Sequence, residues 1–463
     1  MSGSLETTEV QRLAAFAAGA EFDDISPEAL EQLKIRVLDT LGVAIGALDA
    51  EPIVAIRQLV EELGGAPSST LIGGGRTSPQ LAAFTNSALS RYLDFMDSYL
   101  AKGETNHPSD NLGAVLAAAE SVDASGAELL TALAVAYQVH TRLSDVAPVR
   151  AKGFDHTTQG AFAAAASAAK ALGLPAEQIA HATAIAGTAN AALRVTRTGN
   201  LSHWKGLAYP HVAKEGVFAA LLARRGITGP EAVFEGNKGF KESIAGPFDI
   251  DWSAEDLESV RRTIIKKHNA EIHSQSALDT ALDIRAQDGF NVRAVEKVRL
   301  TTFDVAHSII GGGEEGDKRL IRTKEEADHS LLWMLAVVLL DGELTPAQYE
   351  PGRIVADDVQ SLLTRVEIIP SQEFSDRFPE HMPADLEIVL ADGTVFRSSQ
   401  DSYRGFHDDP LDWAAAREKF DALVTPFAGP ALRDEIAELV HDLEHRSVAE
   451  LTAALARVPV TRR

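Results

Sequence analysis

Apolar residues in the first half of the chain recur at intervals of three and four, which is typical of amphipathic helices. The clearest start is Ser-Pro-Glu at 26–28, with a capping serine, a proline at the first helical position and an acidic first turn. Ser-Pro at 78–79 repeats this start and opens a predicted helix to about residue 95, while Ser125 and Glu128 have capping-box spacing. Further helices are predicted over 157–172, 176–189 and 211–225.

After about residue 290 the spacing changes from helical to alternating. VEKVRLTTF at 295–303 alternates and is rich in β-branched residues, so it predicts a strand. Asp392-Gly393 is a strong hairpin signal between two further alternating runs. The other predicted elements are strands over 366–369, 385–390 and 394–398, and a helix over 327–340.

These patterns predict a mainly α fold with an α+β part. We expect a large all-helical domain over 1–265 together with 405–463, interrupted by a smaller α+β domain over 266–404. The helices are rich in alanine, which allows close approach of helix axes. Part of that enrichment has a simpler explanation, since alanine is the best helix former.

Charge and composition then narrow the functional class. Lys and Arg total 43 against 67 Asp and Glu, a formal net charge of -24, which argues against a nucleic-acid or anionic-membrane surface. The absence of cysteine excludes disulfides, thiolate metal sites and thiol nucleophiles. The start of the chain predicts no signal peptide, and the longest strongly apolar run, 331–340, is too short to span a bilayer. We therefore expect a soluble, cytoplasmic protein.

Two polar groups follow the helix predicted from 79. Asp94, Asp97 and Ser98 fall at i, i+3 and i+4, so a continuing helix would gather them into one patch. A solvated helix end is the structural alternative. NHPSDN at 106–111 then leads into an apolar helix whose N-terminus, capped by its Ser or Asp, favours anions near His107.

Two basic groups occur later in the chain. The stretch 194–214 contains no acidic residue, and Arg and Lys side chains suit carboxylate ligands. A surface paired with acidic helices is the alternative. The segment 266–275 lies at the predicted domain boundary, where ligand clefts are common. The basic residues of the first stretch are Arg194, Arg197, His203, Lys205, His211 and Lys214, and Lys266 and His273 belong to the second.

Cofactor motifs are not found. The glycine-rich stretches 73–75 and 311–318 match neither nucleotide-binding pattern, and we expect ordinary loops there. The 14 histidines include no H-E-x-x-H and no compact set with carboxylates, so we expect no metal and no cofactor.

Five blocks of sequence follow one another in a specific order. They are RYLDFMDSYLAKGETNHPSDNLGAVLAAAE (91–120), GFDHTTQGAF (153–162), SHWKGLAYPHVAKEGV (202–217), KKHNAEIHSQSALD (266–279) and DHSLLWMLAVVLLDGELTPAQYE (328–350). Together they closely resemble the MmgE/PrpD family, whose best-known members are 2-methylcitrate dehydratases. The resemblance covers essentially the whole chain and implies a helical domain, an α+β lid and a homodimer.

The resemblance also implies a pocket. Ser98 stands where threonine is usual, which keeps the hydroxyl. The step from Ser98 to His107 is longer than in the cis-aconitate decarboxylase branch and favours the dehydratase branch. The pocket residues carried over by position are Asp94, Ser98, His107, His156, Lys205, Lys266 and His273.

The implied activity is dehydration of 2-methylcitrate, or a related β-hydroxy tricarboxylate such as citrate, in propionate catabolism by metal-free acid–base catalysis. A proton next to a carboxylate must leave, so cations must neutralise the charge that develops there. Lys205 and Lys266 are the candidates, with Arg194 and Arg197 as further ones.

Proton transfer requires a second set of groups. Asp94 and His107 are the expected general base and acid, in either order, and His156 is expected to share the acid role. A sister activity, cis-aconitate decarboxylation or epimerisation of an iminodisuccinate-type substrate, would use the same pocket. A non-enzymatic helical scaffold is the remaining alternative.

Overall fold

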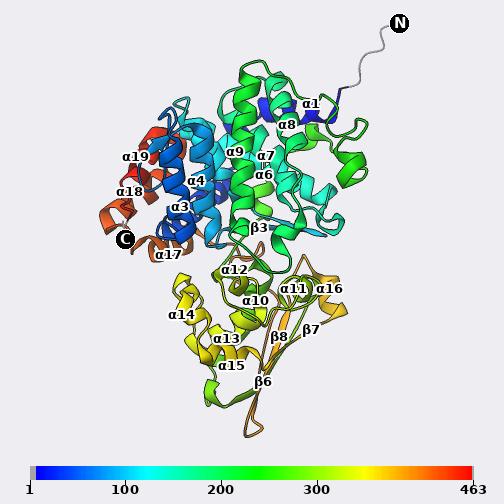
Figure 1. Ribbon diagram of the computed structural model, residues 1–463, viewed down its shortest axis with the longest axis vertical. Coiled ribbons are helices and arrows are strands. Elements are labelled where there is room, and N and C mark those ends of the chain that lie inside the picture. The colour runs from blue at the N-terminus through cyan, green and yellow to red at the C-terminus, as the bar shows by residue number, and fades with distance from the viewer. Residues whose placement is uncertain (1–6, 461–463) are drawn as a thin grey trace. The chain divides into compact units, whose positions relative to one another are not determined.

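The computed structural model describes residues 7–460 and divides them into two compact units, each with its own hydrophobic core (Figure 1). The first unit contains residues 7–194, 206–263 and 411–460, and the second contains 195–205 and 264–410. Within the described range, no helix combines the length and the apolarity needed to cross a membrane. The predicted class, mainly α with an α+β part, is confirmed. The predicted domain boundaries stay a prediction.

Helices are the main elements of the first unit. They are α1 (Glu9–Gly19), α2 (Pro27–Gly46), α3 (Glu51–Leu63), α4 (Pro79–Tyr92), α5 (Leu112–Glu120), α6 (Gly126–Val146), α7 (Thr157–Ala171), α8 (Ala176–Ala189), α9 (Trp204–Arg224), α17 (Trp413–Val424), α18 (Pro430–His441) and α19 (Val448–Ala456). The first two residues of α9, Trp204 and Lys205, belong to the second unit. Two predicted caps are confirmed: Ser26 accepts from the Ala29 amide, and Ser125 and Glu128 form a capping box. At the third, Pro79 begins α4 as predicted, but the Ser78 side chain makes no capping hydrogen bond. Helix α9 begins earlier than predicted and contains Pro210, which has no amide hydrogen to donate to the carbonyl four residues earlier.

The two ends of the chain share the core of this unit. Helix α17 packs on α2, and a Cβ added at Gly42 would lie 3.2 Å from the Cα of Phe420. The Lys419 ammonium lies 2.7 Å from an Asp39 carboxylate oxygen in this contact, and both side chains are buried. Burial raises the pKa of Asp39 and lowers that of Lys419, although their mutual attraction opposes both shifts.

The predicted continuation of a helix to residue 95 is wrong. Helix α4 ends at Tyr92, and Asp94 adopts a left-handed backbone conformation with φ 55°, which aspartate tolerates better than most residues. The chain then forms an antiparallel hairpin in which Tyr99 pairs with Asn106. A 3₁₀ turn over Pro108–Asn111 connects it to α5. The hairpin strands are β3 (Asp97–Ala101) and β4 (Glu104–Asn106).

The second unit is built on a four-stranded sheet in the order β7-β6-β8-β9. Strands β6 and β7 are parallel, whereas β6–β8 and β8–β9 are antiparallel. The predicted hairpin is confirmed, with Gly393 at φ +86° in its turn. The strands are β6 (Val295–Thr302), β7 (Val366–Pro370), β8 (Ala384–Leu390) and β9 (Val395–Gln400).

Helices complete the second unit, and α10 and α13 contact the sheet (Figure 1). The helix predicted over 327–340 begins later, at Leu331, because Ser330 caps that start by accepting from the Trp333 amide. The short helix α12 ends at Ala327, before this cap. The longer helices are α10 (Gln275–Arg285), α11 (Asp304–Ile310), α13 (Leu331–Asp341) and α15 (Asp357–Leu363), with α12 (Lys324–Ala327), α14 (Pro351–Ile354) and α16 (Gln372–Arg377) as short ones.

Candidate active site

The hairpin β3–β4 brings Ser98 and His107 together in the first unit. The His107 Nδ1 lies 2.8 Å from the Asp97 carbonyl oxygen and 3.0 Å from the Ser98 Oγ. A carbonyl oxygen only accepts, so Nδ1 carries the hydrogen that it donates. In the neutral imidazole, Nε2 is therefore the basic nitrogen, and His107 can take a proton there or return one.

Asp97 holds this histidine through its backbone and is itself held by its side chain. Its carbonyl accepts a hydrogen bond from the His107 Nδ1, and its carboxylate accepts from the Ser109 hydroxyl at 2.6 Å and the Tyr137 hydroxyl at 2.7 Å. Burial raises the pKa of Asp97, against the effect of these hydrogen bonds. Ser109 thus bonds to Asp97 rather than capping α5, and the three polar residues Asp94, Asp97 and Ser98 do not share a helix face as predicted.

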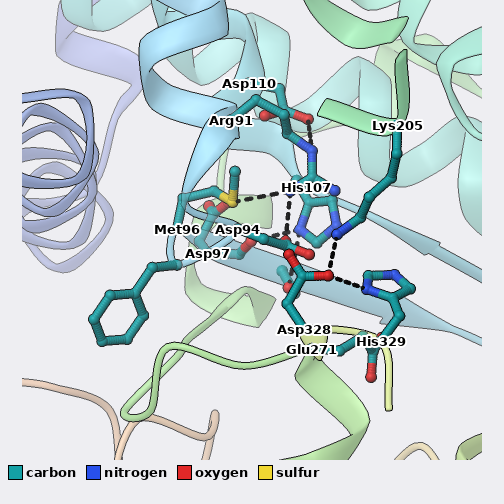
Figure 2. Close-up of polar contacts among 12 residues, drawn as sticks. Arg91, Asp94, Met96, Asp97, His107, Asp110, Lys205, Glu271, Asp328 and His329 are labelled. Carbon is teal, nitrogen blue, oxygen red and sulfur yellow. Dashed lines mark hydrogen bonds and ion pairs between the residues drawn. The ribbon is translucent and has the colours of Figure 1, made fainter. Parts of the chain in front are cut away.

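Arg91 at the end of α4 holds Asp94. Its Nη1 lies 2.5 Å from the Asp94 Oδ1, and its Nε lies 3.7 Å from an oxygen of Asp110 (Figure 2). All three side chains are buried, and Arg stays charged in proteins. The guanidinium therefore gives the Asp94 carboxyl group a buried cationic partner at contact distance.

His156 lies beside His107 in the same unit. It precedes α7, and its ring centroid is 5.7 Å from that of His107 in an edge-on arrangement. Its other face stacks on Tyr209 at 6.4 Å, and the Tyr209 hydroxyl donates to the Asn111 side chain. The first unit thus brings together two histidines and a serine, with the Asp94 carboxylate held by Arg91.

The second unit collects cations around Asp328. The Lys205 Nζ lies 2.7 Å and the His329 Nδ1 2.8 Å from the Asp328 Oδ1 (Figure 2). The Lys324 Nζ lies 2.6 Å from the other oxygen, Oδ2. Burial alone would raise the pKa of Asp328, but the two lysines hold it well below its usual range. The buried carboxylate therefore fixes Lys205 as a charged group.

A second cluster in this unit surrounds Glu271. One carboxylate oxygen accepts from the His273 Nδ1 and the other from the His273 amide, both at 2.8 Å. Burial would raise the pKa of Glu271, but His273, His329 and Lys266 lower it to about 2. The His273 Nε2 is buried and makes no hydrogen bond to any residue in the described range. It is therefore available to a ligand.

The basic stretch 194–214 is divided between the two units. The Arg194 Nη1 lies 3.7 Å from a carboxylate oxygen of Asp155 in the first unit, whereas Arg197 is buried in the second. Lys267 and His268, next to Lys266, are both held by Asp279 and serve the structure.

Sequence reasoning did not select several residues that order these clusters. Arg91 shows the Arg–Asp spacing of three that an ion pair at a helix end requires, and Asp328 and His329 open the last of the five blocks. Neither unit by itself gathers three histidine or carboxylate ligands within its described residues. The metal-free mechanism stays a prediction.

Two family models match the chain. The MmgE/PrpD N-terminal domain matches residues 11–253, and the MmgE/PrpD C-terminal domain matches residues 268–445. The chain is 30% identical over 393 residues to the 2-methylcitrate dehydratase of Escherichia coli (strain K12), covering 78% of each chain. It is 29% identical over 392 residues to that of Cupriavidus necator, again covering 78% of each. It is 26% identical over 469 residues to the cis-aconitate decarboxylase of Homo sapiens, covering 95% of this chain and 93% of that relative.

Proposed function

Because the chain belongs to the MmgE/PrpD family, we propose that it is a hydro-lyase that dehydrates 2-methylcitrate, or a related β-hydroxy tricarboxylate such as citrate, to the cis-unsaturated acid. Relatives named 2-methylcitrate dehydratase and cis-aconitate decarboxylase make it a lyase. The observation that carries the proposal is the His107 imidazole, whose Nδ1 proton is fixed by a carbonyl while Nε2 stays basic, with His156 beside it.

The reaction needs a base, an acid and positive charge. Asp94, paired with Arg91, and His107 supply the proton-transfer pair, and His156 shares the acid role toward the departing hydroxide. Lys205 and Lys266 neutralise the negative charge that develops on the substrate carboxylate. Ser98 and His273 contribute hydrogen bonds to substrate, and Arg194 and Arg197 are further cations in the proposal.

A second candidate function is supported by the human relative. Cis-aconitate decarboxylation would use the same proton-transfer residues but release carbon dioxide, and an epimerase of the iminodisuccinate type would change only stereochemistry. The step from Ser98 to His107 favours the dehydratase. We further propose a homodimer, which light scattering of the purified protein would test.

A substrate panel tests the proposal. Purified protein is incubated with 2-methylcitrate, citrate and cis-aconitate, while absorbance of the unsaturated product and released carbon dioxide are followed separately. Absorbance that rises with a hydroxy tricarboxylate and without carbon dioxide supports the dehydratase. Carbon dioxide from cis-aconitate, with no dehydration of either hydroxy acid, overturns it in favour of the decarboxylase.

The proposal also predicts that the activity is independent of metal. Acid–base residues supply the whole mechanism, so dialysis against a strong chelator should leave turnover unchanged. The check is turnover before and after dialysis, with metal content measured in the same samples. Activity that is lost on chelation and returns with one specific metal would contradict this mechanism.

A further inference from the structure

The glycine-rich loop 311–318 of the second unit ends in a lysine that the mechanism above does not use. Backbone contacts hold the loop in its middle and at its end: the Glu315 amide donates to the Ser308 carbonyl, and the Ser330 hydroxyl donates to the Lys318 carbonyl at 2.6 Å. The same Ser330 Oγ caps α13. Since Ser330 is two residues from Asp328, this contact fixes the Lys318 backbone beside the segment that holds the Asp328 cluster.

Lys318 is buried without a close anionic partner. The exposed fraction of the residue is 5%, and in the described part of the chain its Nζ, which keeps some access to solvent, makes no hydrogen bond and no ion pair within 4.0 Å. Lys205 and Lys324 differ, because each has Asp328 at contact distance. A buried ammonium that lacks such contact costs free energy.

The charges around Lys318 also influence its ammonium group. Burial is the main cause that lowers the pKa of Lys318, and nearby Lys205 acts in the same direction. The carboxylates that oppose this shift are Glu315, Glu271 and Asp328. Two of them are committed elsewhere, since Glu271 accepts from His273 and Asp328 is shared by two lysines.

We propose that Lys318 is a substrate-binding residue whose ammonium pairs with a carboxylate of the polycarboxylate substrate, next to Lys205. This inference rests on the proposed function for the chemical class of the ligand. The substrate carboxylate provides the anionic contact that Lys318 lacks in the protein itself. Until substrate binds, the burial of Lys318 therefore lowers the free energy of unfolding.

The test compares Lys318→Met with its neighbour Arg319→Met. Arg319 is exposed and lies 3.5 Å from Asp317, so its removal controls for loss of one positive charge from the same loop. The ligand is propane-1,2,3-tricarboxylate, which has three carboxylates but no hydroxyl to eliminate, and calorimetry measures its Kd. We expect Lys318→Met to weaken binding by about tenfold or more. Arg319→Met should stay within about twofold of the wild type.

Thermal unfolding without ligand separates binding from a structural role. Removing an unpaired buried charge should leave the melting temperature of Lys318→Met equal to or above that of the wild type. If Lys318→Met does not fold, Lys318→Gln, which is uncharged and polar, replaces it. A melting temperature that falls together with affinity in both variants assigns a structural role and overturns the inference. Unchanged Kd in a folded variant overturns it as well.

Kinetics with 2-methylcitrate distinguishes this inference from the proposed function. A contact to a carboxylate that does not react should raise KM more than it lowers kcat. Wild-type turnover with unaltered KM and Kd in Lys318→Met overturns the inference and leaves the function intact. A third outcome is that the wild type binds the probe tightly and Lys318→Met does not, while the wild type turns over no substrate. This outcome overturns the proposed function and supports the inference. A wild type that does not bind the probe overturns the inference.

Discussion

Asp328 is one carboxylate serving two lysines, and each of its oxygens has its own partner. Such a buried carboxylate holds the lysine ammonium groups in defined positions. A cation that is already in position can stabilise the negative charge that develops on a substrate during the reaction. Lys205 and Lys324 share this partner but differ in their expected roles. Only Lys205 belongs to the predicted pocket, and the two lysines therefore form a matched pair for mutation.

Replacing Lys205 by Met should lower turnover by about 100-fold, the scale of one preorganised charge stabiliser. Lys324→Met removes the other lysine from the same carboxylate and should lower turnover much less. Steady-state kinetics on both variants, with circular dichroism to verify the fold, makes the comparison. Equal losses in the two variants would assign both lysines only to the structure around Asp328.

A buried histidine in α6 gives a prediction about pH. The His140 ring lies 5.6 Å from that of Tyr209, and its Nε2 makes no hydrogen bond within the described residues. Burial lowers the pKa of His140 from 6.5 to about 3. Between pH 6.5 and pH 3, His140 therefore binds a proton in the unfolded chain but not in the folded one. Its contribution to the free energy of unfolding is present above pH 6.5 and is lost as the pH falls toward 3.

The loss from this single group should be on the order of 3 kcal/mol between pH 6.5 and pH 4. His140→Leu removes the titrating group, so its free energy of unfolding should fall less steeply over that interval. Urea unfolding at a series of pH values measures both slopes. Parallel slopes for the variant and the wild type would show that His140 does not contribute.

At the scale of elements, close helix approach positions the hairpin that carries His107. Helices α4 and α5 precede and follow that hairpin, and they meet at Gly113. A Cβ added at Gly113 would lie 2.3 Å from the Ser87 Oγ and 2.6 Å from the Ser87 amide nitrogen. A backbone atom cannot move aside as a side chain can, so glycine is required for this contact.

Gly113→Ala should therefore destabilise the protein by about 1–3 kcal/mol, the range for overpacking a core. It should also lower turnover, because separating α4 from α5 displaces the hairpin between them. The control is Gly19→Ala at the end of α1, where an added Cβ meets nothing within 4 Å. Thermal unfolding of both variants provides the measurement, and a stable, fully active Gly113→Ala would contradict this account.

Periodicity and capping predicted the helices well, because both signals lie within a few residues of each other. The hairpin β3–β4 was missed because its determinants are not local. Asp94 leaves the helical conformation beside a buried Arg91, and Asp97 bonds to Ser109 and Tyr137 from other elements. Spacing along one helix cannot show such contacts.

The candidate site likewise contains residues that the sequence predicted and others that it did not. The histidine and lysine positions were selected from the family resemblance, and their roles stay predictions. The groups that orient them are charge partners from distant segments, such as Asp328 for Lys205 and Glu271 for His273. A carboxylate between lysines is recognisable only once the fold has brought both together.

At the scale of the whole molecule, the predicted site residues are distributed over two units with separate cores. Asp94→Asn should remove proton transfer while still binding ligand, since the change keeps the shape and removes a negative charge. In this variant, 2-methylcitrate should slow amide exchange around His107 and around 266–275, and raise the melting temperature. Hydrogen-exchange mass spectrometry makes the measurement. Protection confined to one unit, or wild-type turnover by Asp94→Asn, would contradict the assignment of both residue sets to one substrate.

The pairing of α2 with α17 has a consequence for biosynthesis. Asp39 leaves the ribosome long before Lys419 is translated, because most of the sequence lies between them. At about 5–20 residues per second, α2 therefore carries an unneutralised carboxylate and an uncovered apolar face for tens of seconds. The residues of the second unit are translated in that interval and form a separate core. We therefore expect the second unit to fold while the core around α2 is still incomplete, and that core to close only once α17 has been translated.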